Sequence, residues 1–246
     1  MTEHSAAHRP AFHGVLFDMD GTLIDTEPLW QASERSMMAE FGVAWTKSDE
    51  EHCHGGSAER VCAYMADRVA DTGQPRPDPG FFEEGFERLM VSALSEQPPA
   101  LQPGGVELVA ELAEADVPLA LVSSSQRVLM DLVLNHFDSD WFGLTVSAND
   151  VTRFKPDPLP YRQGADGIGV DPRWCIAIED SPTGIASAQA AGAFVVAVSH
   201  GLDLVEGERC RVIPDLSGVT MQLLSDWFVA PDFDSIALDD QQRNGV

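Results

Sequence analysis

The stretch that decides the fold is Val15-Leu16-Phe17-Asp18-Met19-Asp20-Gly21-Thr22-Leu23-Ile24-Asp25. An apolar run ends here in two carboxylates, those of Asp18 and Asp20, and Gly21 then breaks the pattern. Short apolar runs bounded by such breakers are typical of buried strands in a parallel sheet. Ligands of open α/β sheets collect at the carboxyl ends of the strands. We therefore expect Asp18 at that edge, with a turn at Gly21 that brings Asp20 back beside it.

Two carboxylates this close repel each other, and burial at a strand end disfavours both ions. A hard cation relieves both effects, and Mg²⁺ prefers one or two carboxylates together with substrate phosphate. The alternative interpretation is a strand followed by an Asp-rich solvated turn, because Asp and Gly are common turn residues. The other strand ends of the chain decide between these two interpretations.

Alternating strand and helix patterns after residue 97 predict a doubly wound parallel α/β sheet. Strands are expected over 118–122, 143–147, 174–178 and 194–198, with an edge strand at 212–213. Helices are expected over 106–115, 127–137, 159–168 and 181–191.

An all-helical insertion is expected between the first strand and the rest of the sheet. Its helices are predicted over 27–41, from Ser57 onward and over 81–94, with a polar, turn-rich segment at 45–56. The domain organisation that follows is a discontinuous core over 12–26 and 97–228, a helical domain over 27–96, and an acidic tail over 229–246.

Composition narrows the range of partners. The formal net charge of −25 argues against nucleic acid, since phosphate backbones are bound by basic surfaces. No apolar stretch reaches the roughly 18 residues of a membrane span, and the polar N-terminus has no apolar signal core. Four widely separated cysteines favour a reduced setting. We expect a cytoplasmic monomer with no membrane partner.

Three further strand ends carry chemically useful side chains. Ser123 and Ser124 follow a strand and open a helix, where hydroxyls and free backbone N–H groups can hold a phosphate. Lys155 lies in a proline-stiffened loop after the next strand, and Glu179 and Asp180 follow another apolar run. Each feature alone is typical of a helix cap or a solvated loop. Four coincidences at one edge of one sheet favour a site.

The sequence resembles the haloacid dehalogenase superfamily in four motifs that stand in that family's order: Asp18-Met19-Asp20-Gly21-Thr22, Val122-Ser123-Ser124-Ser125, Lys155-Pro156 and Ile178-Glu179-Asp180-Ser181. The resemblance covers roughly residues 12–225 and is closest to the branch of beta-phosphoglucomutases and small sugar-phosphate phosphatases. It implies a Rossmann-like core, and the helical insertion matches that branch's cap domain in position and length.

The resemblance also implies catalytic roles and a cofactor. Asp18 would attack phosphorus in line and form an aspartyl-phosphate, which divides one difficult step into two. Asp20 would protonate the leaving oxygen and then activate the incoming water. Mg²⁺ would be held by Asp18, the backbone carbonyl of Asp20 and Asp180, with Glu179 assisting from the outer shell.

The remaining motif residues would bind the substrate, a small phosphorylated metabolite. Ser123, Ser124 and Lys155 would hold the phosphoryl oxygens, because positioning and charge stabilisation do most of the work in phosphoryl transfer. Thr26 would face the cap and the substrate, although capping of the following helix is an equal alternative for this residue.

The cap motif favours hydrolysis over migration of the phosphoryl group. A phosphomutase must grip a second phosphate, and phosphoglucomutase relatives place a lysine and an arginine around the Gly-x-Ser turn of the cap. Here the turn is His54-Gly55-Gly56-Ser57-Ala58, so His54 and Ala58 replace those two cations. We expect a Mg²⁺-dependent phosphatase acting on a sugar phosphate, with His54, Gly55 and Ser57 contacting the substrate. A beta-phosphoglucomutase-type mutase and a non-catalytic binding protein on the same scaffold are the alternatives.

Overall fold

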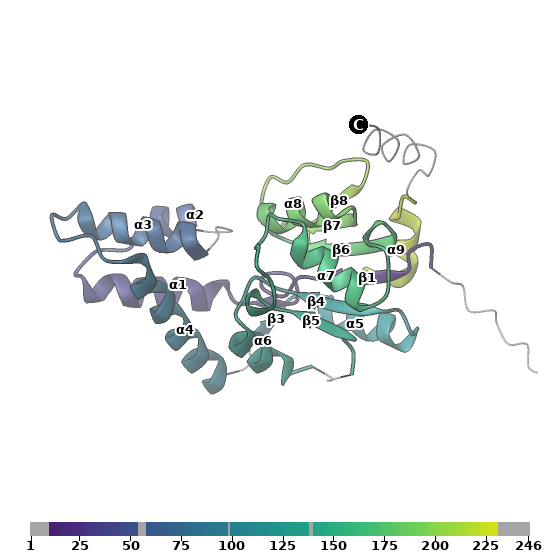
Figure 1. Ribbon diagram of the computed structural model, residues 1–246, viewed down its shortest axis with the longest axis horizontal. Coiled ribbons are helices and arrows are strands. Elements are labelled where there is room, and N and C mark those ends of the chain that lie inside the picture. The colour runs from purple at the N-terminus through teal and green to yellow at the C-terminus, as the bar shows by residue number, and fades with distance from the viewer. Residues whose placement is uncertain (1–9, 54–57, 98, 138–139, 231–246) are drawn as a thin grey trace, which may run out of the picture.

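The computed structural model of the chain describes residues 10–53, 58–97, 99–137 and 140–230. Its larger part is a six-stranded parallel sheet with helices on both faces (Figure 1). The strand order is β5-β4-β1-β6-β7-β8. Counted along the chain, this is the 3-2-1-4-5-6 order of doubly wound folds, so the expected fold class is confirmed. The strands are β1 Gly14–Phe17, β4 Leu119–Val122, β5 Leu144–Val146, β6 Cys175–Glu179, β7 Phe194–Val198 and β8 Cys210–Ile213.

The central strands read as continuous apolar runs because both of their faces are covered. Successive side chains of a strand point to opposite faces. In β1, Val15 and Phe17 pack with α5 Gly105–Glu114, α6 Arg127–Leu134 and α9 Met221–Trp227. Leu16, between them, packs on the other side with α7 Leu159–Gly167 and α8 Pro182–Ala191. The polar residues at the ends of these strands are therefore the candidates for a functional site.

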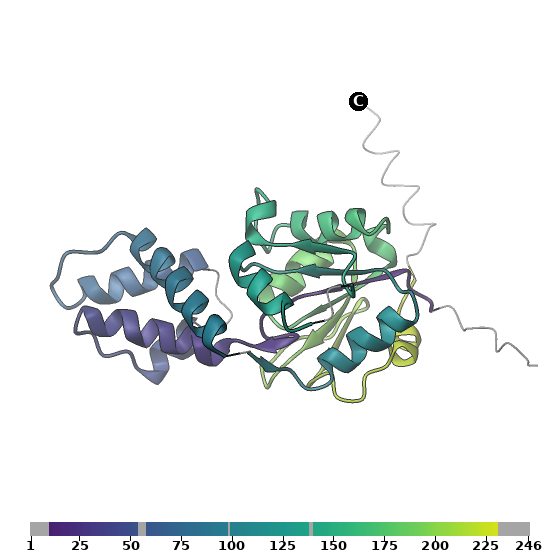
Figure 2. The same cartoon turned by 90° about the horizontal axis from the view of Figure 1, so that it is seen from below.

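In the described residues, the expected helical insertion is present as four helices, which lie beside the sheet domain (Figure 2). They are α1 Glu27–Glu40, α2 Lys47–Cys53, α3 Ala58–Ala70 and α4 Pro79–Glu96. These helices have a hydrophobic cluster of their own, which includes Met37, Met65 and Phe82.

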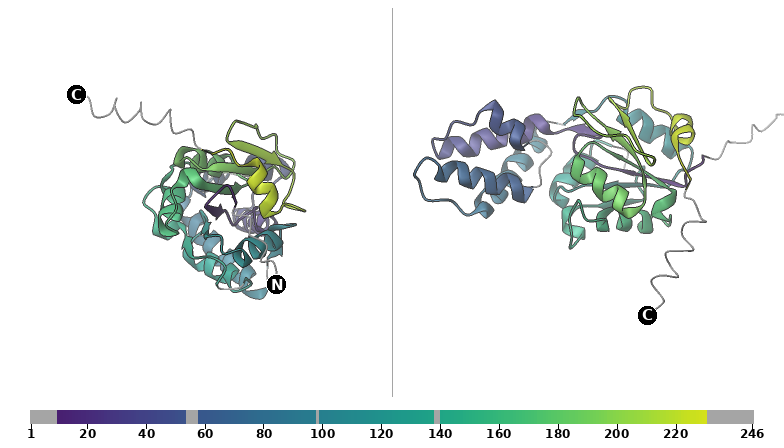
Figure 3. Two further views of the ribbon diagram at one scale, coloured as in Figure 1. Left: turned by 90° about the vertical axis from the view of Figure 1, so that its right-hand side faces the viewer. Right: turned by 90° about the horizontal axis from the view of Figure 1, so that it is seen from above.

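Two connections join the helical part to the sheet part. An antiparallel pair, β2 Ile24–Asp25 and β3 Ala100–Leu101, lies where the chain leaves and re-enters the sheet domain. Helix α4 packs along α6. Figure 3 shows the two parts side by side, with this junction between them.

The structure corrects the prediction of a turn-rich segment at 45–56, because α2 occupies much of it. The carboxylate of Asp49 accepts hydrogen bonds from the backbone N–H and the hydroxyl of Thr46, at 2.8 and 2.7 Å. A threonine followed three residues later by an acid is a helix-start signal, and the low apolar content of this stretch hid it.

Other boundaries differ by smaller amounts. Helix α6 ends at Leu134 rather than 137, and α9 and the β2–β3 pair were not predicted from the sequence. The predicted helix start at Ser57 lies outside the described residues, as does the predicted acidic tail beyond residue 230.

All four cysteines are free and buried. Among the described residues, no helix combines the length and the apolar character that crossing a bilayer requires. Cys175 and Cys210 lie in the part of the core between the sheet and helices α7 and α8, where small side chains fill the space.

Truncation in β7 tests the importance of this core. Val195 is 0% exposed in β7, whereas Val205 is 84% exposed. We expect Val195→Ala to lower the free energy of unfolding by about 2 kcal/mol, because two buried methyl groups are lost and a cavity remains. The control Val205→Ala should change it by less than about 0.5 kcal/mol. Urea unfolding measures both, and equal effects would contradict the assigned core.

Candidate active site at the carboxyl edge of the sheet

The predicted site residues follow three adjacent strands. Asp18 follows β1, Ser123 follows β4, and Glu179 is the last residue of β6. Strands β4 and β6 flank β1, and Phe17 pairs in register with Leu121 on one side. The strand order reverses beside β1, and ligands of doubly wound sheets bind at such a reversal. The order of the strands therefore brings these three side chains to the same edge of the sheet.

Lys155 lies at the centre of the site. Its ammonium donates to Asp18 Oδ1 and Glu179 Oε1, both at 2.6 Å, and to the carbonyl oxygen of Val122 at 2.9 Å. Lys155 is only 7% exposed. Burial alone would lower the pKa of this ammonium, but the carboxylates of Asp18 and Glu179 raise it well above its usual range. Lys155 is therefore a fixed positive charge beside Asp18.

Glu179 is fully buried and surrounded by donors. Besides Lys155, the hydroxyl of Tyr161 donates to its Oε1 at 2.8 Å. Its Oε2 accepts from the backbone N–H groups of Asp180 and Ser181, and from the Ser181 hydroxyl, each at 3.1 Å. Helix α8 approaches this carboxylate at Gly184, where a Cβ would lie 1.7 Å from Glu179 Oε1. A glycine is needed at this position.

Gly21 has a similar function on the other side of the site. Its φ is +81°, in the left-handed region that favours glycine, and its N–H donates to the Ile24 carbonyl at 2.8 Å. A Cβ there would lie 2.0 Å from Asp180 Oδ2. The tight turn after β1 thus lets the Asp180 carboxylate approach the backbone.

Three hydroxyl groups hold the carboxylate of Asp20. Thr26 donates to Oδ1 at 2.8 Å, and Ser123 and Ser125 donate to Oδ2 at 3.1 and 2.7 Å. The Ser123 hydroxyl also accepts from the backbone N–H of Ser125 at 2.9 Å. The carboxylate of Asp20 is therefore held in one orientation, between the cap helix α1 and the end of β4.

Asp18, Glu179 and Asp180 form an acidic cluster whose ligand atoms lie within 4.8 Å of one another. Burial, followed by the charge of Glu179, raises the pKa of Asp18 well above its usual range. The same two causes raise the pKa of Asp180 to about 8. Buried carboxylates with an excess of negative charge are a ligand set that hard divalent cations prefer. This donor set fits a divalent metal ion.

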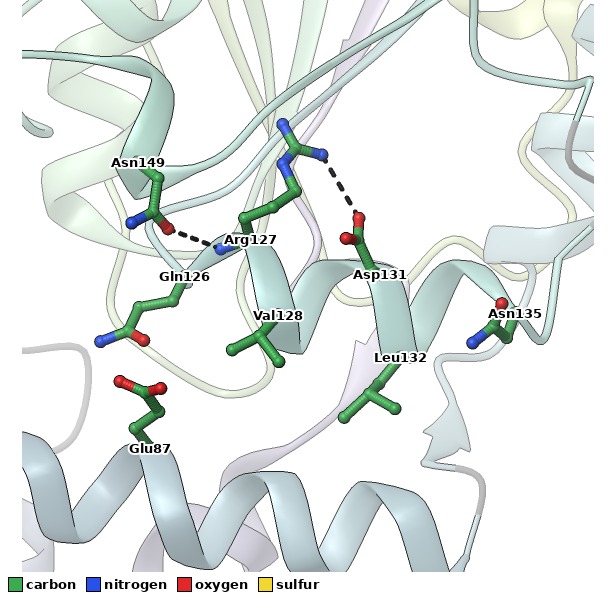
Figure 4. Close-up of a pocket in the computed structure, with 8 residues that line it drawn as sticks. All are labelled: Glu87, Gln126, Arg127, Val128, Asp131, Leu132, Asn135 and Asn149. Atoms are coloured by element: carbon green, nitrogen blue, oxygen red, sulfur yellow. Dashed lines mark hydrogen bonds and ion pairs between the residues drawn. The ribbon is translucent and has the colours of Figure 1, made fainter.

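A separate hollow of about 570 Å³ lies between α4 and α6 (Figure 4). Glu87 of α4 faces Gln126 across it, and the backbone N–H of Arg127 donates to the side-chain oxygen of Asn149 at 2.8 Å. None of its lining residues belongs to the acidic cluster. The hollow marks the junction of the two parts of the molecule rather than the site of chemistry.

Comparison with known proteins identifies the family. Residues 15–198 match the family described as haloacid dehalogenase-like hydrolase. The chain belongs to this hydrolase family. It is similar to hexitol phosphatase B of Escherichia coli K12, with 36% identity over 72% of this chain and 79% of that one. It is also similar to validoxylamine A 7'-phosphate phosphatase of Streptomyces hygroscopicus subsp. limoneus, with 32% identity over 75% of this chain and 84% of that one.

Solved structures show the same fold. CbbY from Rhodobacter sphaeroides, in complex with phosphate, superposes with a TM-score of 0.72 at 22% identity, over 87% of this chain and 99% of that one. Beta-phosphoglucomutase from Clostridium difficile gives a TM-score of 0.73 at 22% identity, over 92% and 99%. The resemblance inferred from the motifs, and the expected class of hydrolase, are confirmed.

The hydrolase fold brings most of the predicted site residues together: Asp18, Asp20, Thr26, Ser123, Lys155, Glu179 and Asp180. Ser124 is exposed, between the two serines that bind Asp20. The predicted cap residues His54, Gly55 and Ser57 lie outside the described residues.

Sequence reasoning missed four residues of this hydrolase site: Ser125, Tyr161, Gly184 and His200. His200 has a left-handed φ of +43°, and its Nε2 lies 2.7 Å from the carbonyl oxygen of Gly21. Only Ser125 carried a signal, since it belongs to the serine run after β4. Tyr161 and His200 are brought to the site by contacts between distant segments, whereas Gly184 lies on the helix that directly follows Glu179 and matters through the close approach of that helix.

Gly184→Ala tests the close approach of α8 to Glu179. Ala is favoured over Gly inside a helix by about 1 kcal/mol, so helix propensity alone predicts stabilisation. The 1.7 Å approach to Oε1 instead requires Glu179 or α8 to move, and we expect lower activity and a lower Tm. The control is Gly207→Ala, whose Cβ would lie 3.8 Å from Cys210 Cβ. A fully active and stable Gly184→Ala would contradict the description of this contact.

The raised pKa of Asp180 predicts a pH-dependent response to a divalent cation. Because its folded pKa of about 8 lies above the usual value of 3.8, this carboxyl stabilises the metal-free protein at low pH, and that stability is lost as pH rises through about 8. A cation must displace the bound proton, so its apparent affinity should rise towards about tenfold per pH unit from about pH 6 to 8. The shift in Tm that Mg²⁺ causes, followed across this pH range, measures the apparent affinity. Asp180→Asn should make that shift depend less on pH. A shift in the wild type that is the same at every pH would contradict the prediction.

Proposed function

We propose that this hydrolase is a Mg²⁺-dependent phosphatase that hydrolyses a small phosphomonoester, with a sugar phosphate as the favoured class. The observation that carries the proposal is the placement of Asp18 beside the Lys155 ammonium and within the acidic cluster. The names of the phosphatase relatives support this class of reaction. The proposed setting is the cytoplasm and the proposed state is a monomer.

Asp18 is the proposed nucleophile. Its carboxylate attacks phosphorus, displaces the alcohol oxygen and forms an aspartyl-phosphate that water then hydrolyses. Lys155, 2.6 Å from Asp18 Oδ1, is placed to balance the charge of the phosphoryl oxygens. Ser123 and Ser124 are the proposed further phosphate contacts. The alcohol and inorganic phosphate are the products.

Asp20 is the proposed acid and base. Thr26, Ser123 and Ser125 orient its carboxyl group by hydrogen bonds. In the first step Asp20 gives a proton to the departing alcohol oxygen, and in the second step it takes a proton from the attacking water. The three hydroxyls keep its geometry the same for both steps.

Asp18, Asp180 and the backbone carbonyl of Asp20 are the proposed ligands of Mg²⁺, with Glu179 in the outer shell. When bound, the ion supplies a positive charge that offsets the charges of the carboxylates and of the phosphoryl group. Glu179 holds Lys155 in place and accepts hydrogen bonds from the N–H groups of Asp180 and Ser181, just before α8. Its role is therefore to fix the positions of the other groups.

The contacts of Arg60 support hydrolysis rather than phosphoryl migration. Arg60 is the cap residue that could replace the cations of a mutase. Its Nη2 donates to the carbonyls of His52 and Cys53, at 2.8 and 3.4 Å, at the end of α2. The guanidinium thereby stabilises the C-terminus of a helix, where positive charge is favoured. Mutase activity remains the second candidate because the phosphoryl-transfer residues would be shared.

The proposed domain organisation assigns residues 27–96 to a cap and 12–26 with 97–228 to the core. The cap helices end at Glu96, close to this boundary. The cap would cover the site during transfer and exclude water that competes with the acceptor. His54, Gly55, Ser57 and Thr26 are the proposed substrate contacts from the cap side.

Asp18→Asn tests the proposed function. We expect phosphate release to fall by at least about 10³-fold, since only positioning and charge stabilisation remain. The fold should survive, because burial already disfavours the charged form of Asp18. Phosphate release from a panel of phosphomonoesters with Mg²⁺ measures the activity, and the exposed Asp166→Asn is the control.

The products of the same assay distinguish the candidate functions. The panel includes beta-glucose 1-phosphate with a bisphosphate primer. Its conversion to glucose 6-phosphate without phosphate release would establish a mutase and contradict the phosphatase proposal. Phosphate release by Asp18→Asn at the wild-type rate would exclude Asp18 as the nucleophile.

A further inference from the structure

Glu34 is a buried carboxylate of the cap that the proposed phosphoryl transfer does not use. It lies on α1 and is 5% exposed. Trp45 Nε1 donates to its Oε2 at 3.0 Å, whereas its Oε1 accepts no hydrogen bond within the described part of the chain. Every fully buried polar side-chain atom of the described residues has a partner. Oε1 therefore retains some exposure to solvent.

The other buried carboxylate of the described cap, Asp49, shows what a structural role requires. Asp49 accepts hydrogen bonds from Thr46, from the Tyr64 hydroxyl at 2.7 Å and from Arg68 Nε at 2.8 Å. Its charge is thus balanced by a cation and its hydrogen-bonding capacity is used. Glu34 has one neutral donor, and packing does not explain its burial.

The surroundings of Glu34 add negative charge. Burial, and then the charges of Glu27 and Glu50, raise its pKa to about 7 against the opposing hydrogen bond from Trp45 and the opposing charge of Arg35. A group in this state can accept a hydrogen bond, or donate one, close to neutral pH. It can pair with hydroxyl groups, and its acidic neighbours repel a second anion.

Glu34 lies about two turns along α1 from the end of this helix that adjoins the site. Thr26, which binds Asp20, immediately precedes α1, and Glu34 follows roughly 12 Å further along the helix. Glu27 and Glu34 are seven residues apart and so share a helix face. Glu34 also contributes to the raised pKa of the thiol of Cys53, the last residue of α2. Figure 1 shows the start of α1 and the end of α2 directed towards the sheet.

We propose that Glu34 binds hydroxyl groups in the non-phosphate part of the substrate and selects polyhydroxylated phosphomonoesters over esters that carry a second anion. This inference rests on the proposed phosphatase function. A hydroxyl group donates to Oε1, while Trp45 keeps Oε2 in place. Buried polar groups that lose a matching partner discriminate strongly between substrates.

The experiment compares three phosphomonoesters whose non-phosphate parts differ in hydroxyl groups and charge. Sorbitol 6-phosphate offers hydroxyl groups, phosphoglycolate carries a second anion, and p-nitrophenyl phosphate has neither feature. The purified full chain is assayed with Mg²⁺ as wild type, Glu34→Met, Glu34→Gln and Asp49→Asn. Met has a similar length but no acceptor, Gln retains one acceptor oxygen, and Asp49→Asn controls for loss of a buried cap carboxylate.

We expect Glu34→Met to lower kcat/KM for sorbitol 6-phosphate about tenfold relative to p-nitrophenyl phosphate, the loss of one hydrogen bond. Relative activity towards phosphoglycolate should rise. Glu34→Gln should recover most of the preference for sorbitol 6-phosphate over p-nitrophenyl phosphate but, being neutral, should not recover the discrimination against phosphoglycolate. Asp49→Asn should lower Tm and change the three activities in parallel.

Two other outcomes overturn the inference in distinguishable ways. Parallel changes in all three activities for both Glu34 variants would show a structural role for Glu34, with the phosphatase function intact. Release of phosphate from none of the three esters by the wild type would refute the proposed function on these substrate classes, and the inference with it.

Discussion

The contact between the Lys155 ammonium and the carboxylates of Asp18 and Glu179 is the interaction on which the site depends. Each of these charges is buried, and isolated buried ions are strongly disfavoured. One ammonium contacts two of the three carboxylates in the cluster but offsets only one negative charge. Burial, together with the remaining negative charge, raises the pKa values of Asp18 and Asp180. The folded protein therefore carries an excess of negative charge at this site, which a bound cation can offset.

The sheet holds these like-charged groups close together despite their repulsion. Adjacent parallel strands bring their carboxyl ends to one edge, and the apolar residues behind that edge hold it in position. Close packing then sets the distances: Gly21 and Gly184 let Asp180 and Glu179 approach backbone that any larger side chain would push away. The hydroxyl of Tyr161 completes the hydrogen bonding of Glu179 from α7. A site of this kind depends on several segments that are distant along the chain.

That dependence explains what could be predicted from the sequence. Asp18 and Glu179 lie at the ends of short apolar runs, and strand ends of one sheet must meet, so their proximity followed from local patterns. Lys155 lies in a loop after β5, and its place in the site followed from the order of the motifs. Tyr161 and Gly184 lie within ordinary helices. The role of Tyr161 arises from a contact with the distant Glu179, and that of Gly184 from how closely α8 approaches Glu179. The helix α2 was missed because its start signal, Thr46 with Asp49, lies in a polar segment without apolar periodicity.

The two buried carboxylates of the cap show how the same chemistry can serve structure or recognition. Asp49 is enclosed by donors that include a guanidinium, so its charge joins α2 to α3 through Tyr64 and Arg68. Glu34 has a single indole donor, and the Trp45 hydrogen bond and the charge of Arg35 do not outweigh its burial and its acidic neighbours. A protein with a net charge of −25 repels anions at long range. Positive charge at Lys155 can then attract the phosphate locally, while negative charge at Glu34 disfavours a second anion at the other end of the substrate.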